Sequence, residues 1–409
     1  MPLSLYLLAL AVFAMGTSEF MLAGLLPDIA ADLGVTVGAA GTLTSAFAIG
    51  MVAGAPLMAA LARNRPGRAA LLGFLLLFSA AHAVGAVTTS LPVLLTTRVL
   101  AALANAGFLA VALTTAAALV PPGRKGRALA VLLSGTTIAT IAGVPGGSVL
   151  GTLLGWRATF WAVAALCLPA AAGVLKAIPG RRAEPDTAAS PLRAELARLA
   201  RPRLLLVMLL GALVNAATFA SFTFLAPVVT GTGGLDEWWV PVALVLFGAG
   251  SFAGVTIAGR LSDRRPGLVI AVGGPLLLAG WPALAVLAGE PVALLTLVFV
   301  QGTLSFALGG TLITRVLYEA AGAPTMAGSY SIAALNVGAA AGPLIAATTL
   351  GTAAGELGPL WTSGLLVAVA LLLALPFRPA VTGDQRHAAP QGRVERTHPP
   401  HTESDHHRH

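Results

Sequence analysis

Two stretches of the chain, Gly50-Met51-Val52-Ala53-Gly54 and Gly250-Ser251-Phe252-Ala253-Gly254, place two glycines four residues apart at positions that differ by 200. A basic turn follows each stretch, Arg63-Asn64-Arg65-Pro66-Gly67 in the first case and Asp263-Arg264-Arg265-Pro266-Gly267 in the second. Glycines at this spacing lie on one face of a helix and let two helix backbones approach closely within a membrane. Because the glycines and the Pro-Gly turn recur at one offset, the pattern predicts two similar halves.

The residues around both stretches are strongly apolar. Hydrophobic residues make up 57% of the 409 residues and charged residues only 10%, whereas a soluble domain carries about 25% charged residues. Runs of about 20 apolar residues are long enough to cross a bilayer. Twelve such runs occur, at 4–26, 39–61, 69–88, 92–119, 128–151, 158–178, 203–229, 239–260, 267–288, 292–313, 327–349 and 358–377. The first run carries Glu19 and has no basic residues before it, so it indicates a membrane span rather than a cleaved signal peptide.

The runs fall into two groups of six, which predicts an all-α membrane protein of two pseudo-symmetric six-helix bundles. We expect an N-terminal bundle at 1–178, a cytoplasmic linker at 179–202, a C-terminal bundle at 203–378 and a disordered cytoplasmic tail at 379–409. The tail holds six of the seven histidines but no apolar periodicity, and its histidines are too scattered to predict a metal site.

The basic residues indicate the orientation of the spans. With the N-terminus inside, all of the 24 basic residues except Arg98 and Arg157 fall on the inner side. The predicted outer loops instead collect acids, namely Asp28, Asp32, Asp236, Glu237, Glu290 and Glu356. Since cytoplasmic loops retain Lys and Arg, we expect a multi-pass protein of the plasma membrane with both termini in the cytoplasm. The net charge of +8 therefore reflects topology, and we expect no nucleic-acid partner.

Two charged residues, Glu19 and Arg98, lie well inside the predicted spans. A charge at that depth costs about 2.5–3.5 kcal/mol on insertion scales, so each one needs a partner or a water-filled cavity. Glu19 lies eight residues before Pro27 in a span that runs outward, and Arg98 lies seven residues after Leu91 in a span that runs inward. At about 1.5 Å per residue, both lie at a similar depth. His82, near the outer end of its span, is expected to be a capping or interfacial histidine.

Other classes of protein are excluded by what the sequence lacks. It contains no G-x-x-x-x-G-K-[ST] phosphate loop, which an ATP-driven pump would need. It also contains no H-E-x-x-H or G-x-S-x-G motif and no in-span group of metal ligands. We therefore expect neither an enzyme with catalytic residues nor a protein with a metal or another cofactor. A receptor or scaffold would not need a carboxylate in its first span.

The loop Gly259-x-Leu261-x-Asp263-Arg264-Arg265-Pro266 resembles the signature loop of the major facilitator superfamily. The resemblance to this superfamily covers essentially all of residues 1–378. In the first half the corresponding region follows Gly54, and Arg63 stands where the signature has an aspartate. The resemblance implies that the two bundles rock about a central site in an alternating-access cycle.

Span 5 resembles the antiporter motif of exporters in that superfamily, through Gly135, Gly143, Pro145, Gly146, Gly147 and Gly151. Span 11 carries a looser copy, Asn336-x-Gly338-x-x-x-Gly342-Pro343. The opening stretch Gly16-Thr17-Ser18-Glu19-Phe20 through Pro27, with Asn105-Ala106-Gly107-Phe108 and Gly155-Trp156-Arg157, is similar to the chloramphenicol-exporting branch of drug:proton antiporters. Ordinary packing glycines remain the alternative for span 5.

The resemblance implies proton-coupled efflux of a small neutral amphipathic drug, with chloramphenicol the leading substrate and export of a sugar or metabolite the alternative. Glu19 is the predicted proton carrier and Arg98, at the position of the superfamily's span-4 arginine, its predicted coupling partner. Ala101 and Ala102 replace the usual Gln and Gly beside that arginine, and a static ion pair is the rival reading. The predicted cavity residues are Thr17, Asn105, Asn215, Thr218, Phe222, Tyr330 and Asn336. The expected partners are the drug, protons and the lipid bilayer, with the chain acting as a monomer.

Overall fold

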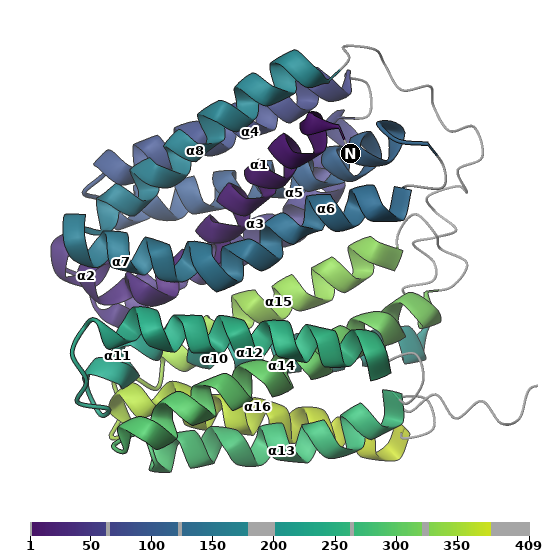
Figure 1. Ribbon diagram of the computed structural model, residues 1–409. Helices are drawn as coiled ribbons and strands as arrows, with labels where there is room; N and C mark the ends of the chain where they lie inside the picture. The colour runs from purple at the N-terminus through teal and green to yellow at the C-terminus, as the bar shows by residue number, and fades with distance from the viewer. Residues whose placement is uncertain are drawn as a thin grey trace, which may run out of the picture.

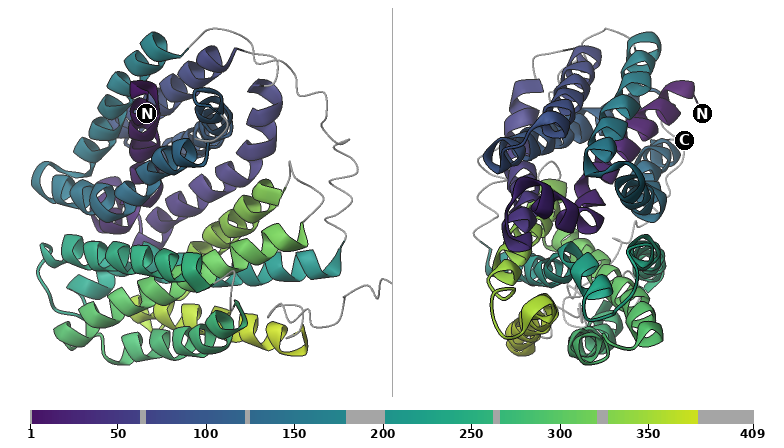
Figure 2. Two further views of the ribbon diagram at one scale, coloured as in Figure 1. Left: turned by 45° about the vertical axis from the view of Figure 1, so that its right-hand side comes forward. Right: turned by 90° about the vertical axis from the view of Figure 1, so that its left-hand side faces the viewer.

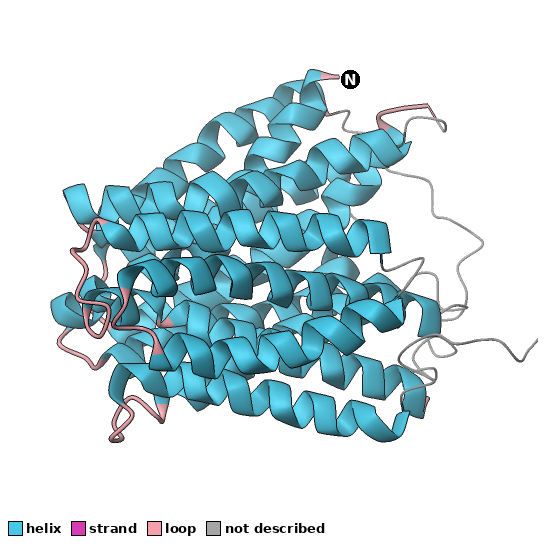
Figure 3. Ribbon diagram, turned by 60° about the horizontal axis from the view of Figure 1, so that its bottom comes forward, coloured by secondary structure: helices cyan, strands magenta, loops and turns pink. Residues whose placement is uncertain are grey.

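The computed structural model describes residues 2–62, 66–121, 125–178, 201–261, 266–320 and 327–377. Most of the predicted linker, the predicted tail, and Arg63, Asp263 and Arg264 of the signature loops lie outside these ranges. The described part is helical throughout, and no strand occurs in it (Figure 3). Helices satisfy every backbone hydrogen bond within one segment, which is what an apolar environment requires of a single crossing.

Twelve helical spans long and apolar enough to cross a membrane are present in the described residues, as the sequence predicts. The first half contains α1 (Leu3–Phe20), a 3-10 turn η1 (Met21–Gly24), α2 (Leu26–Leu33), α3 (Val37–Ala62), α4 (Gly67–Val87), α5 (Leu91–Ala118), α6 (Lys125–Ile138), a π turn η3 (Ala139–Gly143), α7 (Val144–Leu154) and α8 (Trp156–Ala177). The second half contains α10 (Pro202–Thr223), α11 (Leu225–Thr230), α12 (Trp239–Leu261), α13 (Pro266–Val286), α14 (Pro291–Glu319), α15 (Ala327–Ala347), a 3-10 turn η5 (Gly355–Leu357), α16 (Gly358–Ala374) and a 3-10 turn η6 (Leu375–Phe377).

The two halves form two helical bundles that lie side by side, the first above the second in Figure 1. The short helices α2 and α11 lie at one end of the molecule, which we call the outer end, and the N-terminus lies at the opposite end, the inner end (Figure 1). Two further views show the same division into bundles (Figure 2).

The duplicated glycines make the same contact in both bundles. A Cβ at Gly54 would lie 2.9 Å from the Cβ of Ala106 on α5, and a Cβ at Gly254 would lie 2.9 Å from the backbone nitrogen of Ala307 on α14. Such distances leave no room for a side chain, so α3 packs against α5 and α12 against α14 with their backbones close together. The repeat seen in the sequence is therefore a repeat of helix packing.

The glycines of the antiporter-like span and of its copy also have matching positions. A Cβ at Gly135 of α6 would lie 2.9 Å from the backbone nitrogen of Phe13 on α1. A Cβ at Gly338 of α15 would likewise lie 2.9 Å from the backbone nitrogen of Ala216 on α10. Span 5 thus packs on span 1 as span 11 packs on span 7, which extends the internal repeat to a second pair of helices.

The bundles interlock at the outer end. A Cβ at Gly38, at the start of α3, would lie 3.5 Å from the Cβ of Ala347, the last residue of α15. Phe224 of the second half is buried in the core of the first bundle, while Ala23 and Val144 of the first half are buried in the core of the second. These contacts come from the outer halves of the helices, so the structure is closed across its outer end.

Three spans differ in detail from the uniform helices that the sequence predicts. The first changes to a 3-10 turn after Phe20 and restarts as α2, whose first turn contains Pro27. The fifth contains the π turn immediately before Pro145. The tenth continues six residues beyond the predicted end, to Glu319. Proline has no amide hydrogen to donate, which accounts for the first two breaks.

Candidate functional site

Arg98 of α5 is buried, with 1% of its surface exposed, and it binds α1 rather than solvent. Its guanidinium donates one hydrogen bond of 2.7 Å to the Ser18 hydroxyl and another of 2.9 Å to the Ser18 carbonyl oxygen. The guanidinium carbon also lies 4.4 Å from the centre of the Phe47 ring on α3, a cation–π contact. These contacts satisfy much of a charge that would otherwise be costly at this depth.

Glu19 follows Ser18 and is half-buried. Its carboxyl group interacts electrostatically with Arg98, so the structure brings the two predicted coupling residues together. The ion pairs within the described residues are Arg157–Asp32 and Arg315–Glu319, and neither involves Glu19. A direct Glu19–Arg98 ion pair, the rival reading of the sequence, is thus not formed in this structure.

His82 of α4 extends the cluster. Its Nε2 atom lies 2.6 Å from the Ser18 hydroxyl oxygen and its Nδ1 atom 2.8 Å from the Phe78 carbonyl oxygen. The ring is 2% exposed and packs between Phe78 and Phe160. The expectation of an interfacial or capping histidine is therefore wrong, because the ring points into the bundle and binds α1.

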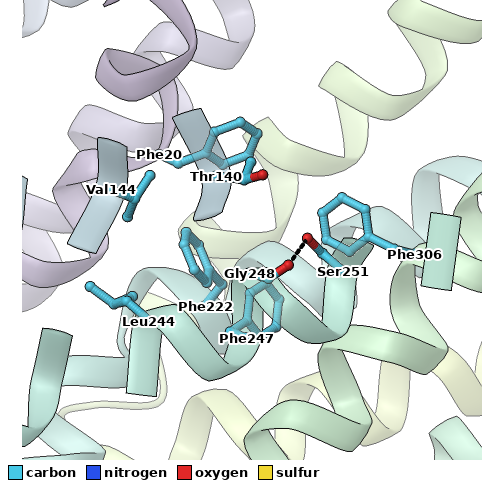
Figure 4. Close-up of a pocket in the computed structure, with 9 residues that line it drawn as sticks. All are labelled: Phe20, Thr140, Val144, Phe222, Leu244, Phe247, Gly248, Ser251 and Phe306. Carbon is cyan, nitrogen blue, oxygen red and sulfur yellow. Dashed lines mark hydrogen bonds between the residues drawn. The ribbon is translucent and has the colours of Figure 1, made fainter. Parts of the chain in front are cut away.

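An aromatic pocket lies between the bundles, one residue beyond Glu19 (Figure 4). Its cavity volume is about 10 Å³, far below the roughly 300–1,000 Å³ typical of sites for drug-sized ligands, so the side chains nearly close the pocket in this structure. Its lining comes from both halves: Phe20, Thr140, Val144, Phe222, Leu244, Phe247, Gly248, Ser251 and Phe306. Ser251 donates its hydroxyl hydrogen to the Gly248 carbonyl oxygen at 2.7 Å (Figure 4). The pocket is thus apolar and aromatic, with two hydroxyl groups and no charge.

Phe222 is the predicted cavity residue that lines this pocket, where its ring is tilted against Phe247 at a centroid distance of 4.7 Å. The other predicted residues do not line it and are engaged within or between helices. Thr17, Thr218 and Asn336 each donate a hydrogen bond to a carbonyl oxygen one turn earlier in their own helices. Asn215 donates to the Leu335 carbonyl oxygen of α15, and Asn105 donates to the Met51 sulfur of α3. Tyr330 is buried. Their assignment to the cavity stays a prediction.

The antiporter-like residues form a packing face. A Cβ at Gly143 would lie 3.1 Å from the Phe13 ring on α1, and a Cβ at Gly147 would lie 3.1 Å from a Thr159 methyl on α8. Pro145 and Gly151 are buried beside them, whereas a Cβ at Gly146 would meet no atom within 4 Å. The motif residues thus pack span 5 against α1 and α8. The π turn of the same span packs against α12, because a Cβ at Gly248 would lie 2.6 Å from the Thr140 carbonyl oxygen. Gly54 and Gly259 of the signature regions lie within α3 and α12.

A second cavity lies at the outer end between α2 and the start of α12. Asp28 and Glu237 both line it, together with Ser148. Burial raises the pKa of Asp28, and the nearby Glu237 carboxylate raises it further. The contact between the bundles at the outer end therefore places two acidic groups of opposite bundles beside one cavity.

Sequence reasoning missed several residues of the site. Ser18 was not assigned a role, and His82 was assigned a capping or interfacial one, because the contact that joins them links residues 64 positions apart in the chain. The pocket residues Phe20, Thr140, Phe247, Ser251 and Phe306 were missed because apolar periodicity does not show which face of a span meets the other bundle. The available signal was the run of polar residues Thr17-Ser18-Glu19 beside Phe20 in an otherwise apolar span.

Comparisons with known proteins agree with this architecture. A family model described as the Major Facilitator Superfamily matches residues 8–334. A chloramphenicol resistance protein of Streptomyces lividans is 79% identical over 383 residues, which cover 93% of this chain and 98% of the relative. The inner membrane transport protein YdhP of Escherichia coli (strain K12) is 33% identical over 359 residues, with 86% of this chain and 91% of the relative covered.

Solved structures share the fold at low identity. A bacterial homologue of the human lysosomal transporter Spinster, in an inward-facing and unoccupied conformation, superimposes with a TM-score of 0.73 at 16% identity and covers 93% of this chain and 96% of its own. The nucleoside transporter NupG (D323A mutant) superimposes with a TM-score of 0.72 at 15% identity and covers 93% of this chain and all of its own.

Proposed function

Because this chain belongs to the Major Facilitator Superfamily and is a multi-pass membrane transporter, we propose that it exports chloramphenicol or a similar small neutral drug in exchange for protons. The single observation that carries the substrate is the near-full-length identity to a chloramphenicol resistance protein. An uncharged pocket lined by aromatic rings, with hydroxyl groups from Thr140 and Ser251, is compatible with such a molecule because it offers apolar contact and few hydrogen bonds.

Proton coupling is assigned to Glu19, with Arg98 as its partner. Glu19 is adjacent in the chain to Phe20, which lines the pocket. Protonation or deprotonation of the carboxyl group can therefore alter the position of a residue that contacts the substrate. In the proposed cycle Glu19 accepts a proton while the site is open to the outside and releases it after the site opens to the cytoplasm. The bound drug leaves in the opposite direction, and at no step do both ends open together.

The structure is closed at its outer end by contacts between the bundles, which supports its assignment as the inward-facing state of that cycle. We place the protein in the plasma membrane with both termini in the cytoplasm, on the distribution of its basic residues. We further propose that the protein is not an enzyme, since its family model and its relatives are those of transporters, and that the monomer is the working unit.

Accumulation of radiolabelled chloramphenicol in cells tests this function. Cells that express the protein should accumulate little drug, and a protonophore should raise the accumulation to the level of control cells. Glu19→Gln should accumulate drug at the control level with or without the protonophore, because its side chain cannot carry a proton. Glu290→Gln, which removes an exposed carboxylate at the outer end of α14, should export normally. Unchanged accumulation in both conditions would withdraw chloramphenicol as substrate and favour a sugar or metabolite.

A further inference from the structure

The hydrogen bonds around Ser18 have a fixed direction. The Phe78 carbonyl oxygen can only accept, so His82 Nδ1 must carry a hydrogen and donate it. A neutral ring then has a lone pair on Nε2, and the Ser18 hydroxyl donates to it across 2.6 Å. The hydroxyl oxygen remains available to accept from Arg98. All three donors therefore point the same way, from Arg98 through Ser18 and His82 to Phe78.

This chain of hydrogen bonds is shielded from solvent. Ser18, His82 and Arg98 are 0%, 2% and 1% exposed, and the surrounding rings of Phe47, Phe78 and Phe160 are uncharged. The titratable and charged groups that act on it are Glu19 of α1, His82 of α4 and Arg98 of α5. In such surroundings hydrogen bonds in series reinforce one another, and an unmade one is costly.

Arg98 accordingly has two alternative anchors. In this structure its NH1 and NH2 atoms bind Ser18, although the Glu19 carboxyl group is near enough to attract it. Its Nε atom has no hydrogen-bond partner, so the guanidinium is not fully satisfied where it lies. An ionised Glu19 would compete with Ser18 for the same donors, since charge-assisted hydrogen bonds are roughly twice as strong as neutral ones.

We propose that Ser18 and His82 are positioning residues of the proton-coupling step: they hold Arg98 away from Glu19 so that the carboxyl group keeps its proton until the step that releases it. The inference rests on the proposed function, because it concerns the same carboxyl group. When Glu19 loses its proton, Arg98 leaves Ser18 and pairs with the carboxylate. His82 acts through Ser18, because its Nε2 lone pair orients the hydroxyl so that the oxygen lone pairs face Arg98.

Labelling of Glu19 with a hydrophobic carbodiimide, which reacts with protonated carboxyl groups, tests this role without any transport. The labelled fraction is measured by mass spectrometry as a function of pH in purified protein, with Glu19→Gln as the blank. In Ser18→Ala, Arg98 loses the hydroxyl partner of its NH1 atom and keeps only the hydrogen bond to the backbone carbonyl, so it pairs more readily with Glu19. We expect the midpoint of labelling to fall by about one pH unit, a roughly tenfold loss of proton affinity. The pH profile of drug export should move in the same direction.

His82 variants separate positioning from packing. His82→Phe keeps an aromatic ring but removes the acceptor, and should shift the midpoint in the same direction as Ser18→Ala. His82→Gln can place its carbonyl oxygen near the position of Nε2 and should restore most of the wild-type profile. Ser79→Ala is the matched control, because that hydroxyl lies on the same helix as His82 but donates to the Ala164 carbonyl of α8.

The outcomes are distinguishable. If Ser18→Ala and His82→Phe lower the yield or the rate of export but leave the labelling midpoint unchanged, the two residues serve packing only and the inference is overturned. If wild-type protein shows the expected labelling profile but exports no drug, the proposed substrate fails while the positioning role stands.

Discussion

Asp32 binds two residues of the family-like stretch Gly155-Trp156-Arg157. Its carboxylate accepts hydrogen bonds from the Trp156 indole and the Arg157 guanidinium, and Arg157 also donates to the Thr88 carbonyl at 3.0 Å. Gly155, whose φ of 81° favours glycine, makes the turn that starts α8. The stretch Gly155-Trp156-Arg157 thus joins α2, the end of α4 and α8 at the outer end of the first bundle.

Arg157→Lys tests that arrangement. Lysine keeps the charge but lacks the planar group that reaches both Asp32 and Thr88 and stacks on Trp156. Because the two side chains are 31% and 42% exposed, we expect a loss of at most about 1 kcal/mol in unfolding free energy, seen as a small fall in Tm of the purified protein. Arg203→Lys, at an exposed position, should leave Tm unchanged, and an equal fall in both would contradict the assignment.

The charged residues of the site could be predicted from the sequence, because a charge inside a membrane span is energetically costly and usually has a function. Glu19 and Arg98 were identified in that way, and the structure places them within electrostatic reach. Ser18 was not identified and His82 was given the wrong role, since uncharged polar residues are common between membrane helices and their partners depend on the rotation of each helix. Phe222 was predicted for its aromatic surface, whereas its pocket neighbours had no distinguishing pattern.

At the scale of the elements, the glycine pattern predicted that spans 2 and 8 pack closely on a neighbouring helix, but not which neighbour, nor where helices bend. The contacts of Gly54 with α5 and of Gly254 with α14 are direct consequences of side-chain size. The π turn before Pro145 and the 3-10 turn after Phe20 follow from the prolines Pro145 and Pro27 beyond them, which the length of an apolar run does not register. Both irregular turns lie where the bundles meet, and π turns are frequent at functional sites.

Gly254→Val should disrupt the α12–α14 contact. A side chain there would be forced against Thr303 and Ala307 backbone atoms, and overpacking of this kind typically costs about 1–3 kcal/mol. We expect a lower yield of monodisperse protein and a fall in Tm. Gly309→Ala is the control, because a Cβ there would meet no atom within 4 Å; if both variants behaved alike, the close backbone contact would not be what stabilises this pair.

At the scale of the whole molecule, the two bundles are related by the duplication and closed at one end. α3 packs on α15 and α12 packs on α7, and the repeat relates these two interfaces because spans 2 and 5 correspond to spans 8 and 11. An interface made twice by the same elements can rotate about a common axis, which is the motion expected of inverted or parallel repeats in transporters.

A disulfide across the outer end tests whether that motion is needed. In the double variant Gly38→Cys with Ala347→Cys, a Cβ separation of 3.5 Å falls within the range that disulfides require. Oxidation should lock the outer end closed and abolish export, and reduction should restore it. The native Cys167 is buried, so replacing it with Ala gives a background without other thiols. Each single cysteine variant should export normally, and full export by the oxidised double variant would rule out opening at this end.

The central claim is that Glu19 couples proton movement to drug export. Inside-out membrane vesicles with an acidic lumen measure this most directly, because uptake of radiolabelled chloramphenicol then corresponds to export. The wild-type protein should concentrate the drug in the lumen, and collapse of the pH gradient should release it. Glu19→Gln should equilibrate the drug without concentrating it, because bound substrate can still cross but no proton is exchanged. Concentration of the drug by Glu19→Gln under the same gradient would contradict the account and move the proton site to another residue.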